Sequence, residues 1–252
     1  MGKYLFETSG TIEPGHGFSL FGPVHLIWLA FFAALSVILI LKYRKWDDKK
    51  RHKCLVVITC LLLADELMKY IATAGTGRFE LGYLPLHTCS INLFVASWYT
   101  FKPSDIVAEA LYAECLPGAI MALLFPSWAK LPPLNIMHIH SFTVHILLAL
   151  YPMLLLAGGF KPNFKRLTKA LPTFAVVAAA VFCFNKVFGT NFMFLNGGGS
   201  GNPLAWAEVY LGNPGYMLII PVLLAIIWGI MYGIPALLRK RGKNERNIGK
   251  SI

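Results

Sequence analysis

Residues 84–94 read Leu-Pro-Leu-His-Thr-Cys-Ser-Ile-Asn-Leu-Phe, which places a group of polar side chains at the start of an otherwise apolar segment. These side chains are His87, Thr88, Cys89, Ser90 and Asn92. A polar group at membrane depth costs free energy unless it finds a partner, so we expect the group to face a protein interior or a wet cavity. The plain alternative is that the hydroxyls and the amide join helices and that the imidazole is a satisfied core residue. Because the cluster surrounds a thiol, it is a candidate functional site.

The composition predicts an all-α, polytopic membrane protein. The chain has 252 residues, of which 56% are hydrophobic and 14% charged. Its apolar runs are close to the ~20 residues that a membrane-spanning helix needs. We therefore predict a bundle of seven transmembrane helices. Their segments are 22–41, 54–74, 84–101, 106–125, 135–157, 168–187 and 215–238.

The basic residues are distributed unequally between the two sides of such a bundle. On one side, residues 42–53 carry seven Lys and Arg, residues 161–169 carry four, the tail from Arg239 carries six, and Lys102 adds one. The opposite side carries three, which are Lys3, Arg78 and Lys130. This asymmetry predicts an external N-terminus and a cytoplasmic C-terminus. It also accounts for the net charge of +11 without a nucleic-acid partner.

The chain divides into an external N-terminal segment (1–21), a seven-helix transmembrane domain (22–238) and a basic cytoplasmic tail (239–252). The first segment lacks the basic start and apolar middle of a cleaved signal peptide. The five cysteines contain no Cys-x-x-Cys pair, so we expect neither a disulfide framework nor a zinc finger. We expect the protein in the cell membrane.

Several titratable side chains are expected at similar depth in the bundle. The helices at 84–101 and 135–157 both begin at the external face, so Cys89, His140 and His145 share the outer half of the membrane. Four carboxylates lie in the same interior, and we expect Lys69, Lys186 or a histidine to be the structural partner of some of them. These carboxylates are Asp65, Glu66, Glu109 and Glu114.

A thiol becomes a nucleophile as its thiolate, and a nearby imidazole is the usual base. Cys89 with His145 meets this need if their helices touch, and His87 or His140 are alternative bases. A second chemistry would use a metal ion to activate water. Its ligands would come from His87, His138, His140 and His145 with Asp65 or Glu66. A third interpretation is a small-molecule transporter, for which intramembrane carboxylates and Lys186 are common.

Three stretches of the sequence resemble the signatures of YwaF-like bacterial integral membrane proteins, a family related to the eukaryotic transmembrane protein 164 family. They are Leu84–Ile91, Phe21–Leu26 (Phe-Gly-Pro-Val-His-Leu) and Asn185–Leu195 (Asn-Lys-Val-Phe-Gly-Thr-Asn-Phe-Met-Phe-Leu). The resemblance covers nearly the whole chain. It implies a cysteine-centred acyltransferase that moves fatty acyl chains between phospholipids, with Cys89 and a downstream histidine, best matched by His145, with His140 and His138 left open.

The first-ranked hypothesis is therefore a membrane acyltransferase or lipid-remodelling enzyme acting through a Cys89 thioester. Its partner would be a phospholipid or another acyl lipid, and it would need neither a cofactor nor a metal. Backbone or Asn92 amide groups would stabilise the oxyanion, and the connection 188–214 is long enough to cover the site. We also expect four more side chains to contact substrate, namely Glu66, Glu114, Asn185 and Asn191.

Overall fold

The protein is a bundle of helices in the computed structural model, which describes residues 2–199 and 202–248; this part of the chain contains no strand. The α-helices are α1 (Pro23–Lys45), α2 (Asp48–Gly75), α3 (Thr88–Phe101), α4 (Asp105–Ala110), α5 (Leu116–Leu124), α6 (Ile136–Ala157), α7 (Phe164–Phe188), α8 (Pro203–Leu211) and α9 (Ile219–Ile248). The short 3₁₀ turns are η1 (Gly2–Tyr4), η2 (Leu81–Tyr83), η4 (Phe192–Phe194) and η5 (Gly215–Leu218), and η3 (Leu111–Cys115) is a π-helix.

Among the described residues, five helices are long and apolar enough to cross a membrane, rather than the seven expected. They are α1, the continuous helix Asp105–Leu124, α6, α7 and Gly215–Pro235. The other two fall short for different physical reasons. The apolar part of α2 carries Asp65, Glu66 and Lys69, and α3 has 14 residues, about 21 Å of helix.

The start of α3 is four residues later than hydropathy predicts. Pro85 disfavours helical geometry in the residue before it, and His87 still has an extended backbone as the N-cap. Thr88 is the first helical residue. His87 thus stands before the helix, while Cys89 lies in its first turn.

The segment Asp105–Leu124 is one helix interrupted by the π-turn η3. A π-turn changes the backbone pairing locally and is frequent at functional positions. Helix α9 packs against this turn: the Trp228 indole donates to the Ala113 carbonyl at 2.9 Å, and the Tyr112 hydroxyl donates to the Met231 carbonyl at 2.8 Å. These two hydrogen bonds hold η3 against α9.

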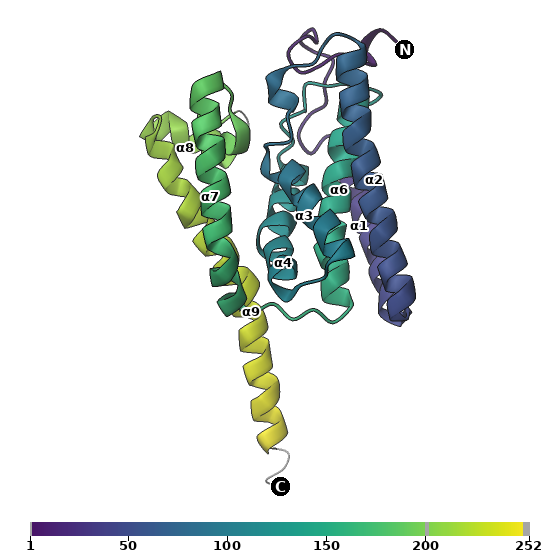
Figure 1. Ribbon diagram of the computed structural model, residues 1–252, viewed down its shortest axis with the longest axis vertical. Helices are drawn as coiled ribbons and strands as arrows, with labels where there is room; N and C mark the ends of the chain where they lie inside the picture. Colours follow the sequence, from purple (N-terminus) through teal and green to yellow (C-terminus); the bar gives the residue numbers. More distant parts are fainter. Residues whose placement is uncertain (1, 200–201, 249–252) are drawn as a thin grey trace.

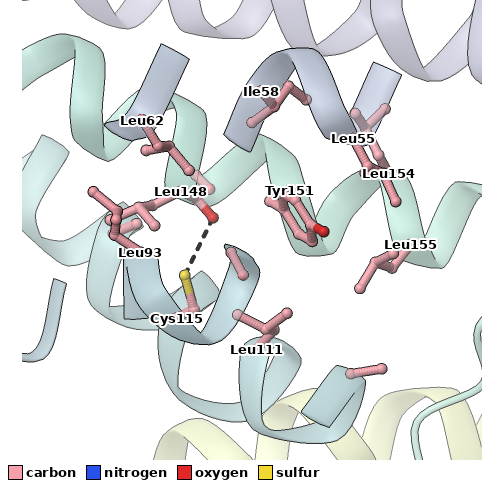
Figure 2. Packing of buried hydrophobic residues seen from close by; sticks show 14 of the residues in the cluster. Leu55, Ile58, Leu62, Leu93, Leu111, Cys115, Leu148, Tyr151, Leu154 and Leu155 are labelled. Carbon is pink, nitrogen blue, oxygen red and sulfur yellow. Dashed lines mark hydrogen bonds between the residues drawn. The ribbon is translucent and has the colours of Figure 1, made fainter. Parts of the chain in front are cut away.

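Helix α6 is the centre of the bundle and packs against α1, α2, α3 and α5. Figure 1 shows α1, α2 and α6 running side by side, with α3 and α4 next to them. The main buried cluster includes Leu62, Leu93, Cys115, Leu148 and Tyr151, as Figure 2 shows. Burial of such side chains contributes about 1.5–3 kcal/mol each in an aqueous reference state. This cluster fixes how α2, α3 and α6 are rotated against each other.

The connection after α7 is more ordered than the flexible loop that its glycines predicted. It contains η4 and α8, and the Gly198 amide donates to the Glu208 carboxylate at 2.7 Å. A Cβ on Gly198 would lie 2.6 Å from the Leu204 carbonyl oxygen, so this close approach requires glycine. The predicted loop also includes residues 200–201, which lie outside the described residues.

The two ends of the chain differ in structure. The predicted external segment folds over the start of α6, where the Asn135 amide donates to the carbonyls of Tyr4 and Glu7 at 2.7 Å each. Arg78 pairs with Glu7 at 2.7 Å and ties this segment to the end of α2. The predicted basic tail continues α9 as helix as far as Ile248, and residues 249–252 lie outside the described part.

Candidate functional site

The site lies where α2, α3 and α6 meet, since each of these helices contacts the other two. Their halves nearer the predicted external face carry most of the intramembrane polar side chains. Helix α2 contributes Asp65, Glu66 and Lys69, α3 contributes Cys89 and Asn92, and α6 contributes His140, Thr143 and His145. His87, at the N-cap of α3, and Asp65 and His140 are close enough to His145 to interact with it electrostatically.

Cys89 is half-buried and packs against the cluster that contains Cys115 and Leu148. Its thiol makes no hydrogen bond to another described residue, whereas the Cys115 thiol donates to the Leu148 carbonyl at 3.3 Å (Figure 2). Cys89 is also in the first turn of α3, where the helix macrodipole favours negative charge. The structure thus leaves Cys89 as a free thiol at a helix N-terminus.

His145 is held in one tautomer. Its Nδ1 lies 2.6 Å from the Ser141 carbonyl oxygen, which can only accept, so Nδ1 carries the proton and Nε2 has a free lone pair. The imidazole stacks on Trp128 with ring centroids 5.0 Å apart and an interplanar angle of 16°. The ring is therefore oriented before any substrate arrives, with a nitrogen available as a base.

Helix register places Cys89 and His145 at similar depth. His87, two residues before Cys89, lies within electrostatic range of His145. Leu93 and Leu148 belong to one buried cluster, and α3 and α6 run in the same direction because the helix 105–124 returns between them. Cys89 precedes Leu93 by one turn, about 6 Å of rise, and His145 precedes Leu148 by about 4.5 Å. His140 precedes Leu148 by about 12 Å, so it lies nearer the external face.

His140 belongs to a buried hydrogen-bonded group with α2. Its Nδ1 donates to Asp65 Oδ1 at 3.0 Å, and the Thr143 hydroxyl donates to Asp65 Oδ2 at 2.6 Å. A carboxylate that holds Nδ1–H orients the ring and leaves Nε2 as the reactive nitrogen. The expectation that a histidine partners one of the intramembrane carboxylates is confirmed here.

Glu66 forms a buried ion pair with Lys69 at 2.5 Å, one turn further along α2. Lys69 is also within electrostatic range of His87. The two residues are three apart on one helix, so the ion pair forms within α2 itself. Neither charge is therefore buried without a partner. Glu66, expected to contact substrate, thus has a structural partner on its own helix.

The turn after α7 covers His87. The Phe192 ring lies 4.9 Å from the imidazole in an edge-on arrangement, and the Met193 amide donates to His87 Nδ1 at 3.4 Å. Two of the stretches that carried the resemblance, Leu84–Ile91 and Asn185–Leu195, therefore meet in space. Met193 and Phe194 have positive φ values of 56° and 55°, which non-glycine residues adopt rarely.

Asn185 and Asn191 build this turn. The side-chain Oδ1 of Asn185 accepts from the Phe192 backbone amide and the Thr190 hydroxyl. The side-chain amide of Asn185 donates to the Phe192 backbone carbonyl. Asn191 donates to the Gly197 carbonyl and accepts from the Asn196 amide. Both side chains thus have intramolecular partners within the loop that carries Phe192 and Met193.

Asn92 and Glu114 stand out because they lack such partners. Asn92 is only 2% exposed, and its Oδ1 has no hydrogen bond. It lies three residues after Cys89, on the same side of α3. Glu114 lies half-buried on the π-turn and makes neither a hydrogen bond nor an ion pair with a described residue. Buried polar groups without partners are uncommon and mark positions where a ligand is expected.

Other polar residues of the bundle have structural roles. The His138 ring accepts from the Trp28 indole at 3.0 Å and donates to the Leu131 carbonyl at 3.2 Å. His25 is fully buried between the Phe21 amide and the Leu123 carbonyl. Glu109 accepts from the Asn163 amide, Arg166 and Tyr232 at the far end of the bundle.

The predicted metal ligands do not converge. Within residues 2–199 and 202–248, no three His, Cys, Asp or Glu side chains are arranged to hold a metal ion. His138 has both ring nitrogens occupied by protein groups, and His140 uses Nδ1 on Asp65. The donor set that the sequence offered for a metal site is thus distributed among protein hydrogen bonds.

Sequence reasoning missed three side chains of this region, namely Thr143, Trp128 and Phe192. Thr143 follows His140 by three residues, a helical spacing that could have indicated a shared partner. Trp128 lies in a connection and Phe192 in the turn after α7. Their contacts with His145 and His87 depend on how loops fold back, for which the sequence carries no periodic signal.

The comparisons with known proteins agree with this architecture. The model of the TMEM164 family matches residues 20–232, from just before α1 to within α9. No curated protein and no solved structure matches the chain. Because the family match extends over most of the sequence and includes α2, α3 and α6, the chain belongs to the TMEM164 family, a family of membrane proteins.

Proposed function

We propose that this protein is a membrane acyltransferase that carries a fatty acyl group on Cys89. The observation that supports this most is that a thiol without a hydrogen-bond partner among the described residues and an imidazole of fixed tautomer lie on two helices in contact. Cys89 and His145 lie at similar depth on two helices in contact, and Nε2 of His145 is unoccupied. The family membership agrees with a lipid substrate.

In the first half-reaction, Nε2 of His145 takes the Cys89 thiol proton, and Sγ attacks the carbonyl carbon of an acyl ester. A C–S bond forms, and the carbonyl oxygen becomes an oxyanion. The ester C–O bond then breaks, and the leaving alkoxide takes the proton from His145. The products are a Cys89 thioester and a lysolipid.

In the second half-reaction, a hydroxyl of the acceptor lipid gives its proton to His145 and attacks the thioester carbon. The C–S bond breaks, and the thiolate recovers the proton. The acyl chain has then moved from one phospholipid to another without a cofactor. The overall reaction breaks one oxygen ester and forms another, so no external energy source is required.

Two unpartnered polar groups fit roles in this chemistry. Asn92 lies on the same side of α3 as Cys89, and its side-chain N–H donates to the oxyanion; the Asn92 atom that is buried without a partner is the Oδ1 acceptor. Glu114 accepts from a polar group of the lipid, since its carboxylate has no protein partner. The loop built by Asn185 and Asn191 packs on His87 through Phe192 and shields the thioester from water.

The charge asymmetry supports seven membrane crossings with α2 and α3 included. Helix α3 alone is too short to cross the membrane. The residues before it, including η2, supply the rest of this membrane crossing. With the N-terminus outside, the thiol is reached from the outer leaflet of the cell membrane. The substrate is then an outer-leaflet phospholipid.

The test is a transfer assay with the purified protein in vesicles of a phospholipid with a labelled acyl chain and an unlabelled lysophospholipid. Cys89→Ala should abolish transfer, whereas Cys115→Ala should retain it, because the Cys115 thiol is already bonded to Leu148. Undiminished transfer by Cys89→Ala would reject the acyl-enzyme mechanism.

A further inference from the structure

A cavity of about 430 Å³ lies at the end of the bundle opposite the cysteine site. Its walls come from the loop before α7, the first turn of α7 and the middle of α9. In Figure 1 the α6–α7 connection reaches the start of α7 beside α9, in the lower half of the view. The charge asymmetry predicts that this end faces the cytoplasm.

The polar wall of the cavity is basic through Lys161, because the carboxylates of Asp105 and Glu109 neutralise Arg166. Lys161 is exposed and forms no ion pair with a described residue. Arg166 is fixed by the carboxylates of Asp105 and Glu109 and by the Lys161 carbonyl, so its guanidinium is held in place at low cost in side-chain entropy. Arg166 remains 23% exposed.

The opposite wall is apolar. Phe164 is 52% exposed, and Met231 and Pro235 of α9 line the same cavity. A basic wall beside an apolar wall, at the end of membrane-spanning helices, matches the two parts of a phospholipid. Basic pockets between transmembrane helices on the cytoplasmic side are a recurrent way of binding anionic headgroups.

We propose that this cavity binds an anionic phospholipid of the adjacent leaflet, with the headgroup phosphate at Lys161 and Arg166 and an acyl chain along Phe164 and Met231. The site is separate from Cys89, and the lipid bound there is not the substrate. The proposal therefore does not depend on the acyltransferase mechanism. Tyr232, which lines the cavity and bonds to Glu109, links the bound lipid to the packing of α9 on the bundle.

The test is native mass spectrometry of the full-length protein released from detergent with phosphatidylglycerol, phosphatidylcholine or inorganic phosphate. We expect phosphatidylglycerol to be retained in preference to phosphatidylcholine. Lys161→Gln should weaken its retention roughly five-fold, the effect of one basic side chain near an anionic lipid. The matched control is Lys165→Gln, because Lys165 is exposed in the first turn of α7, four residues after Lys161, but does not line the cavity.

Equal retention of the two lipids would overturn the proposal, as would equal losses in the two variants, which would indicate a general surface charge effect. Displacement of phosphatidylglycerol by millimolar inorganic phosphate would show that the ligand is free phosphate and would also overturn it. Since Lys161 is exposed and unpaired, its substitution should leave the fold intact.

Discussion

Single imidazoles in this bundle differ in what their two ring nitrogens contact. His25 and His138 use both nitrogens on protein groups, so neither can accept a proton without breaking a buried hydrogen bond. His140 and His145 each use Nδ1 and keep Nε2 free. This distinction assigns structural roles to the first two and leaves the second two as candidate bases.

The structural role of His138 can be tested by His138→Ala. The change removes two buried hydrogen bonds and leaves the Trp28 indole without an acceptor, so the free energy of unfolding should fall by about 2–4 kcal/mol. Thermal unfolding in detergent measures this, with His52→Ala, at an exposed position of α2, as the control. The fraction that remains folded should still transfer acyl groups, and loss of chemistry without loss of stability would contradict the assignment.

The choice between the candidate bases depends on depth. His145→Ala should slow thioester formation by at least about 100-fold, the usual worth of a general base. His140→Ala should have a smaller effect, because its imidazole lies nearer the external face and is engaged with Asp65. In the transfer assay, a double variant of Cys89 and His145 should have no less activity than Cys89→Ala alone. Retained acylation in His145→Ala with loss in His140→Ala would reverse the assignment.

At the scale of elements, the position of α3 determines the site. Because α3 begins at Thr88, its N-terminus opens within the bundle beside α2 and α6, and His87 stands before the first turn. The turn after α7 then packs on His87. A helix starting at residue 84 would have used the backbone N–H groups of the first turn of α3 in regular helical hydrogen bonds.

The sequence predicted part of this arrangement. The polar run at 84–94 and the histidines of α6 were identified from hydropathy and residue type, and the carboxylates of α2 were expected to find partners. The pairing of Asp65 with His140, and of Glu66 with Lys69, depends on the rotation of α2 about its axis. That rotation is set by the packing of Leu62 and its neighbours, which no local pattern specifies.

The N-terminal segment provides a pH prediction. A hydrogen bond from Thr11 and the positive charge of Arg78 hold the pKa of Glu7 below the ordinary value of 4.5. A lowered pKa in the folded state means that the contact stabilises the segment above that value and is lost as the pH falls through the folded pKa. Acid should therefore loosen residues 2–21 before the helices.

Amide hydrogen exchange at neutral pH and at about pH 3, corrected for intrinsic rates, measures this loosening. In Glu7→Gln the segment should exchange faster at neutral pH and respond less to acid. A segment equally protected at both pH values would show that the Glu7 contact does not hold it in place.

At the scale of the whole molecule, the bundle separates two ends of different chemistry. The thiol, the histidines and the Glu66–Lys69 pair lie toward one end, and the cavity with Lys161 and Arg166 lies at the other. Composition and charge predicted the all-helical class and the unequal distribution of basic residues between the two sides of the bundle. They did not predict α8 or the shortness of α3, because loop folding and helix starts depend on individual capping residues.

Orientation is tested by an impermeant thiol reagent on intact cells. A cysteine introduced at Lys130 should react and one at Lys49 should not, because the basic loops are predicted to face the cytoplasm. The unsubstituted protein gives the background of its five native cysteines. Reaction at position 49 with protection at position 130 would invert the topology and place the thiol in the inner half of the membrane.

The most direct test of the central claim is peptide-level mass spectrometry of the purified protein after incubation with phospholipid. The account predicts a hydroxylamine-sensitive acyl adduct on the peptide that contains Cys89. The adduct should disappear in Cys89→Ala, while Cys54, Cys60, Cys115 and Cys183 stay unmodified. Acyl transfer that proceeds with no adduct on Cys89, or with the adduct on another cysteine, would contradict it.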